Sequence, residues 1–99
     1  MEIKQSSDKP LAFAIVGRLD TTTAPTLEDY IANLPNDVWE NMTVDMSECD
    51  FVSSAGLRVI VMMQKHSSSV GGQLTFSGTK EEVMDVFQMT GFTQLLTFV

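Results

Sequence analysis

Residues 45–60 read DMSECDFVSSAGLRVI, and this stretch predicts a strand end, a loop and a helix start. A polar loop is expected at residues 47–50, and a short apolar pair follows it. The small residues 53–56 then begin an amphipathic run that extends to about Ser69. Serine is a favoured N-cap because its side-chain oxygen accepts hydrogen bonds from the free backbone N–H groups of the first turn. The sequence therefore predicts a helix from about Ser54.

Strands and helices are expected to alternate on both sides of this stretch. Apolar or alternating segments predict strands, and apolar residues at helical spacing predict helices. The expected strands are residues 2–5, 11–16, 42–45, 73–76 and 95–99, with a polar turn at residues 6–10, and the expected helices are residues 24–34, 54–69 and 80–90. Thr79 and Glu82 have the spacing of a capping box for the last helix. Such alternation predicts parallel strands joined by crossovers, and the opening hairpin adds an antiparallel strand. The expected fold is α/β, with a mixed, mostly parallel sheet of about five strands.

Length and charge limit the possible functions. The 99 residues are expected to form one domain, residues 1–99, and a hydrophobic content of 43% argues against disorder. A net charge of −7 disfavours binding to nucleic acid and to anionic membranes. No apolar run approaches the roughly 18 residues that cross a bilayer, and the first residues lack the apolar segment of a signal peptide. A cytoplasmic protein without membrane insertion is therefore expected.

Metal and cofactor sites are not predicted. The chain has one cysteine and one histidine, which cannot form a Cys/His zinc cluster within one chain. The glycines lack the spacing of a nucleotide-binding loop. The sequence thus predicts no cofactor.

The serines at the expected helix start have two interpretations. A serine at this place lies beside unpaired backbone N–H groups and the positive end of the helix dipole, so an added phosphate would be tolerated there. The alternative is an N-cap without further function, because serine is a common N-cap in all proteins. The residues alone leave both interpretations open.

Three segments resemble the STAS domain, and in particular the bacterial anti-sigma factor antagonists. Residues 51–57, FVSSAGL, are similar to the family motif of an aromatic, an aliphatic, Asp-Ser, a small residue, glycine and leucine. Residues 17–20, GRLD, are similar to the Gly-x-Leu-Asp motif before the first helix, and residues 86–92, VFQMTGF, to the third helix and its glycine stop. The resemblance covers nearly the whole chain. It implies a single STAS-type domain with helices packed mainly on one face of the sheet.

In that family the domain is a binding switch rather than an enzyme. The resemblance implies that the unmodified protein binds an anti-sigma factor that is also a serine kinase, which releases a sigma factor and regulates transcription indirectly. The kinase then phosphorylates one serine at the start of the second helix, the complex dissociates, and a PP2C-type phosphatase removes the phosphate. Ser54 matches the acceptor. The preceding Asp of the family is replaced by Ser53, which supplies a competing hydroxyl and is the alternative acceptor.

A partner-binding surface is implied around the acceptor serine. On a helical wheel, the residues expected to face the sheet are Leu57, Ile60, Val61 and Gln64. Those expected to face away from it are Ala55, Val59, Met62 and His66. An apolar stripe that faces away from the core is typical of a partner site. The expected partner-binding residues are Asp20, Thr22, Thr23, Ser53, Ser54, Ala55, Gly56, Arg58, Val59, Met62 and His66.

Two other functions remain open. Small STAS subunits also bind transporter ATPases or signalling scaffolds constitutively, without phosphorylation, and the loss of the Asp at position 53 favours this alternative. An enzyme is the third possibility. His66 lies three turns along the helix from Ser54, about 18 Å by helical rise, so it cannot activate that hydroxyl. No catalytic residues are therefore predicted.

Overall fold

The computed structural model of the protein describes residues 1–8 and 11–99. Within them lie six strands, three α-helices and two short 3-10 helices. The strands are β1 (Glu2–Asp8), β2 (Leu11–Leu19), β3 (Asn41–Asp45), β4 (Cys49–Val52), β5 (Gln73–Ser77) and β6 (Thr97–Phe98). The helices are α1 (Ala24–Ala32), α2 (Ser54–Ser69) and α3 (Glu81–Met89), and the 3-10 helices are η1 (Asn36–Glu40) and η2 (Phe92–Gln94).

The strands form one mixed sheet in the order β1-β2-β3-β5-β6, and β4 pairs with the end of β2. Strand β1 is antiparallel to β2, whereas all other pairs are parallel. The predicted α/β fold with a mostly parallel sheet and an opening hairpin is confirmed. Strand β1 continues to Asp8, into the expected turn, and residues 9–10 of that turn lie outside the described residues.

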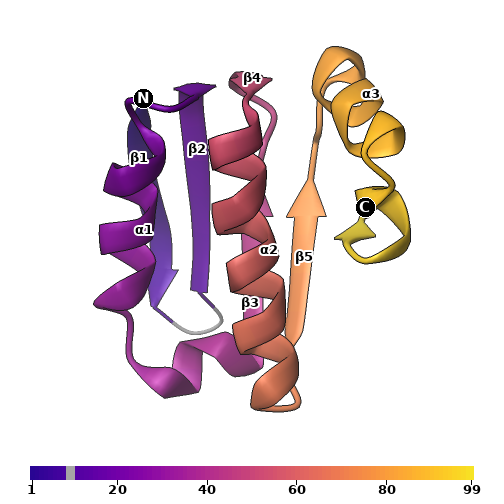
Figure 1. The fold of residues 1–99 in the computed structure, drawn as a ribbon. Coiled ribbons are helices and arrows are strands. Elements are labelled where there is room, and N and C mark those ends of the chain that lie inside the picture. Colours follow the sequence, from indigo (N-terminus) through magenta and orange to yellow (C-terminus); the bar gives the residue numbers. More distant parts are fainter. Residues whose placement is uncertain (9–10) are drawn as a thin grey trace.

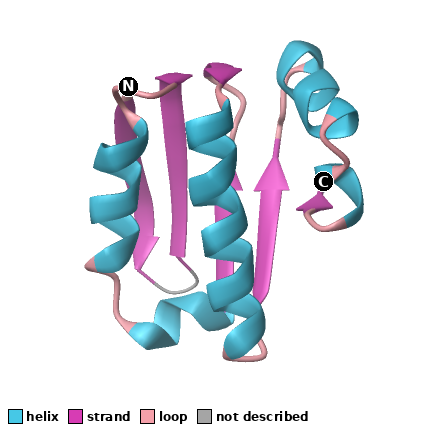
Figure 2. Ribbon diagram, viewed as in Figure 1, coloured by secondary structure: helices cyan, strands magenta, loops and turns pink. Residues whose placement is uncertain are grey.

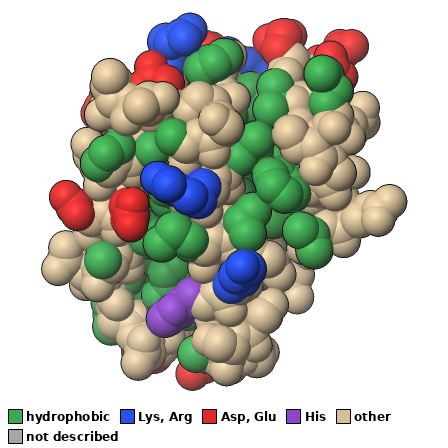
Figure 3. Space-filling model, in the orientation of Figure 1, with side chains coloured by type: hydrophobic (Ala, Val, Ile, Leu, Met, Phe, Trp, Pro, Cys, Tyr) green, Lys and Arg blue, Asp and Glu red, His purple; other side chains and the backbone are tan. Residues whose placement is uncertain are grey.

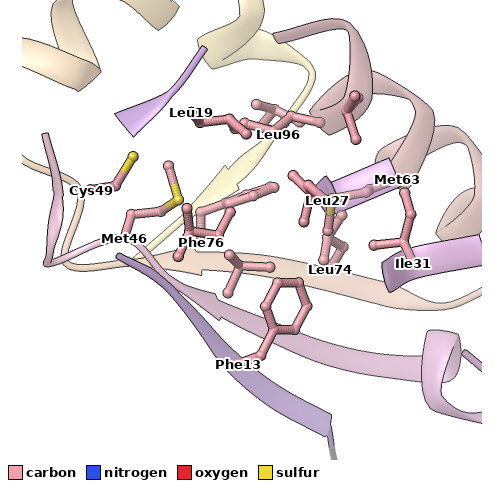
Figure 4. Close-up of a cluster of buried hydrophobic side chains, with 14 of the residues drawn as sticks. Phe13, Leu19, Leu27, Ile31, Met46, Cys49, Met63, Leu74, Phe76 and Leu96 are labelled. Atoms are coloured by element: carbon pink, nitrogen blue, oxygen red, sulfur yellow. The ribbon is translucent and has the colours of Figure 1, made fainter. Parts of the chain in front are cut away.

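Two helices cover one face of the sheet. Figures 1 and 2 show α1 and α2 side by side in front of the strands, while α3 and the C-terminal segment lie beyond β5. The core lies between these layers. Its members come from both layers, and in Figure 4 the side chains of Leu27, Ile31, Met63, Leu74 and Phe76 approach one another. This arrangement agrees with the expectation of helices mainly on one face.

The sequence prediction did not include β4, which begins at Cys49 within the expected loop, and the third helix and last strand also differ from it. Helix α3 begins at Glu81 after the N-cap Lys80, which makes no side-chain cap. The predicted capping box is wrong, since the Thr79 hydroxyl is buried and has no hydrogen-bond partner among the described residues. The expected last strand, residues 95–99, is also shorter, because the N–H groups of Leu95 and Leu96 both donate to the Phe92 carbonyl and continue the turn of η2, so β6 spans only Thr97–Phe98. Of the helices in residues 1–8 and 11–99, none has the length and apolar character needed to cross a membrane.

Candidate functional site

The pairing of β2 with β4 brings together two segments that are distant in sequence. Leu19 is in register with Val52, so the residues that follow each strand lie side by side. The backbone N–H of Ser53 donates to the carbonyl of Leu19 at 2.8 Å. Gly56 packs against the same residue, and a Cβ added there would lie 2.7 Å from Leu19 Cγ and 2.8 Å from its carbonyl oxygen. The start of α2 is thus fixed to the loop after β2.

The two serines at this position have different surroundings. Ser53 is the N-cap of α2, and its side chain accepts a hydrogen bond from the Gly56 N–H at 3.2 Å. Ser54 is the first residue of the helix and is exposed, and its hydroxyl has no hydrogen bond among the described residues. One hydroxyl is therefore used to cap the helix, whereas the other is free on the surface.

The loop after β2 is held by hydrogen bonds to Asp20. Its carboxylate accepts from the Thr22 hydroxyl at 2.7 Å and from the Thr22 and Thr23 N–H groups at 3.0 and 3.2 Å. The Thr23 hydroxyl accepts from the Asp20 N–H at 2.8 Å in return. These bonds, the one from the Thr22 hydroxyl above all, stabilise the charged form and lower the pKa of Asp20 to about 2. Asp20 is thus a fixed negative charge in the loop that adjoins the start of α2.

Two cations lie in this region, and each is partnered. The Arg18 guanidinium stacks 4.3 Å from the centre of the Phe51 ring and lies 3.6 Å from the Asp20 carboxylate. Lys80 forms an ion pair with Asp50, and this carboxylate raises the pKa of Lys80. Among the described residues, both cations are therefore already paired with acids at this end of the sheet.

The exposed face of α2 carries part of the predicted partner surface. Arg58, Met62 and His66 are exposed, and Ala55 is half-buried. His66 also stacks on Trp39 with ring centres 4.5 Å apart. These four positions remain candidates for partner contacts.

Two predicted partner residues lie inside the protein instead. Val59 is fully buried, so the prediction that it faces away from the core is wrong. Helix α2 packs against α1 as well as the sheet, so its buried face is wider than a single-sided wheel predicts. Gly56 is also buried, and the surface that approaches its backbone closely is Leu19 of the same chain rather than a partner. Both residues support the site without forming part of its surface.

A groove of about 410 Å³ extends from Ser54 along α2. Its other wall is formed by Thr90 and Phe92, at the end of α3 and the start of η2. Figure 3 shows hydrophobic side chains gathered between α2 and these C-terminal elements, with basic side chains beside them. The sequence prediction missed five residues of this groove, which are Leu57, Val61, Lys65, Thr90 and Phe92. Val61 was expected to face the sheet, but it is only half-buried and lines the groove.

Within the described residues, Cys49 and the acidic side chains do not gather into a metal site. Cys49, at the start of β4, is fully buried, and this burial raises the pKa of its thiol. In the part of the chain that the structure describes, no three His, Cys, Asp or Glu side chains are close enough together to hold a metal ion. What distinguishes the site is an exposed hydroxyl at a helix N-terminus beside an apolar groove.

Known proteins share this sequence pattern and fold. The family model of the STAS domain matches residues 1–99. BtrV of Bordetella bronchiseptica, which is described as an anti-sigma factor antagonist, is 30% identical over 88 residues, which are 89% of this chain and 76% of that protein. A crystal structure of an anti-sigma factor antagonist candidate from Thermotoga maritima has a TM-score of 0.80 and 19% sequence identity to this chain. The matched region includes 98% of this chain and 83% of the Thermotoga chain.

The anti-sigma factor antagonist SpoIIAA has the same fold in two solved forms. Its unphosphorylated form has a TM-score of 0.78 and 13% identity, and covers 99% of this chain and 88% of its own. Its phosphorylated form, from Bacillus, has a TM-score of 0.71 and 12% sequence identity. The matched region includes 99% of this chain and 91% of the SpoIIAA chain. With the family match over residues 1–99, the paired β2 and β4 ends and the serine at the start of α2, this chain belongs to the STAS domain family.

Proposed function

We propose that this protein is a cytoplasmic anti-sigma factor antagonist without catalytic activity, which regulates transcription indirectly. In this proposal the unmodified protein binds an anti-sigma factor that is a serine kinase, and phosphorylation of Ser54 ends the binding. A PP2C-type phosphatase restores the unmodified state. The observation that supports Ser54 is its exposed hydroxyl, which is free of hydrogen bonds among the described residues, next to a serine that is used as the cap. The names of BtrV and SpoIIAA, and the phosphorylated form of SpoIIAA, support the wider proposal.

A phosphate on Ser54 would act mainly on the interface. It adds about −1.5 to −2 charges at pH 7. The first turn of α2 tolerates this charge, because its free N–H groups and the helix dipole favour anions. A partner that covers Ser54 would have to desolvate the phosphate beside the fixed charge of Asp20, and an unpaired charge in an interface is costly. The switch therefore needs no unfolding of the domain.

The acceptor can be tested with the anti-sigma factor kinase encoded in the same genome. With Mg-ATP, the wild-type protein is expected to gain one phosphate, which tandem mass spectrometry locates on Ser54. Ser54→Ala is expected to gain none. Ser53→Ala is the matched control and is expected to be phosphorylated, although loss of the cap lowers its stability by about 1 kcal/mol. Phosphate found on Ser53 in the wild type would contradict the assignment.

A constitutive STAS subunit is the second candidate, and the serine at position 53 in place of the family's Asp favours it. Such a subunit would bind a transporter ATPase or a signalling scaffold without phosphorylation. A kinase that binds the protein but never modifies it would support this second candidate.

A further inference from the structure

The groove beside α2 is a shallow apolar surface that follows the helix for about three turns. Arg58, Val61, Met62 and Lys65 line it along α2, with Leu57 at its base and Phe92 on the opposite wall. Ser54 and Lys65 are eleven residues apart, or about 16 Å of helix at 1.5 Å per residue. That length equals about three helical turns. Met62 is 40% exposed, so part of this apolar surface is accessible to a partner.

The charge of the groove is opposite to that of the molecule. The chain has a net charge of −7 and only six basic residues, and two of them, Arg58 and Lys65, lie along this groove. Arg18 and Lys80 are paired with acids. By contrast, neither Arg58 nor Lys65 has an ion pair among the described residues. Two unpaired cations beside an apolar surface are complementary to an apolar segment with acidic flanks.

We propose that this groove binds an amphipathic α-helix of the partner, whose apolar stripe is flanked by Asp or Glu side chains. Arg58 and Lys65 are seven residues apart, which is one heptad, so the acids of a helix lying along α2 are expected at a spacing of about seven residues. The proposal rests on the proposed function, because it describes how the anti-sigma factor is held. It also explains how Ser54 controls binding, since a phosphate at the end of the groove would compete for Arg58.

Matched charge reversals test the proposal with the purified anti-sigma factor. Lys65→Glu is expected to weaken binding at least tenfold in calorimetric titration. Lys4→Glu changes the net charge equally on the exposed surface of β1, and its affinity is expected to stay within about twofold of wild type. Equal affinities for these two variants would overturn the proposal. If the wild-type protein itself does not bind, the proposed function fails, which is a different result.

Cross-linking identifies the segment that occupies the groove. A benzophenone side chain at position 61 is expected to label a helical segment of the anti-sigma factor that contains Asp or Glu, and a Glu→Lys change in that segment should restore binding to Lys65→Glu. Labelling of a segment without acidic residues would overturn the proposal. A dimer of the free protein that Lys65→Glu dissociates would also overturn it, because a second copy would then be the occupant.

Discussion

Ser53 and Ser54 are adjacent and chemically identical, yet their positions relative to the helix give them different properties. The Ser53 side chain points back to the Gly56 N–H and caps α2, whereas Ser54 lies within the first turn and is exposed. An N-cap residue has extended backbone, here a φ of −88° and a ψ of 174°, and this conformation directs its side chain toward the first turn. The replacement of the family's Asp by serine therefore keeps a capping group at position 53 and removes its charge.

Asp20 gives a residue-scale prediction that can be tested by titration. Its pKa is lowered from 3.8 to about 2, first by the hydrogen bond from the Thr22 hydroxyl. A carboxylate whose pKa is lower in the folded state stabilises the fold above the unfolded pKa. This contribution is present above about pH 3.8 and is lost as the pH falls toward 2. Thr22→Val removes the largest cause and is expected to raise the pKa of Asp20 toward 3.8, as measured by NMR of the side-chain carboxyl.

The control for this titration is Thr26→Val, at an exposed position of α1 that makes no bond to Asp20 among the described residues. It is expected to leave the pKa of Asp20 at about 2. An unchanged pKa in Thr22→Val would contradict the assignment of the hydrogen bond.

At the scale of elements, α2 shows how neighbouring elements decide which face is buried. Its buried residues are Gly56, Leu57, Val59, Ile60, Met63 and Ser67. This face is rotated relative to the one predicted from the wheel, since Val59 is fully buried and α2 packs against α1 as well as the sheet. The side that carries Val61 is left uncovered and becomes the groove wall. A helical wheel measures periodicity within a helix, but it contains no information on the position of the next helix.

The different burial of Val59 and Val61 can be tested with the same substitution at each position. Val59→Thr places a hydroxyl in a fully buried site and is expected to lower the free energy of unfolding by about 1–3 kcal/mol. Val61→Thr makes the same change in the same helix at the half-buried groove wall, where water can reach the hydroxyl, and is expected to cost less than about 0.5 kcal/mol. Urea denaturation of both variants measures the difference. Equal losses of stability would mean that the two positions are equally buried.

At the scale of the whole molecule, the proposed binding surface is separate from the core. The core lies between the sheet and the helices α1 and α2, whereas Ser54 and the groove lie on the outer side of α2 (Figures 3 and 4). No buried residue depends on the Ser54 hydroxyl for a hydrogen bond among the described residues. We therefore expect a charge at this position to change binding in the proposed function without changing the fold.

Ser54→Asp tests this separation of binding from stability. Aspartate is favourable in a first helical turn, so the free energy of unfolding is expected to change by no more than about 1 kcal/mol. Affinity for the anti-sigma factor is expected to fall more than a hundredfold, which corresponds to about 3 kcal/mol. Thermal melting and calorimetric titration measure the two effects, and Ser68→Asp, at the exposed far end of α2, controls for added charge. Affinity equal to wild type would favour the constitutive subunit over the phosphorylation switch.

The sequence by itself determined the three helices, five of the six strands described and the residue types at the start of α2. Helical periodicity, the small residues at 53–56 and the glycines after the helix are local signals, and α2 begins and ends where they indicate, at Ser54 and Ser69. The motif resemblance of residues 51–57 identified the family and the candidate acceptor, because a motif needs only its own residues to be recognised.

Only the tertiary structure decided which residues are buried and which line the groove. Val59 is fully buried, and Gly56 is held against Leu19 from a strand more than thirty positions earlier in the chain. The groove needs α2 and the end of α3 to lie apart on the surface of one sheet, which no local signal specifies. Contacts between elements distant in sequence depend on how strands pair and helices pack, so the pattern of any single segment cannot predict them.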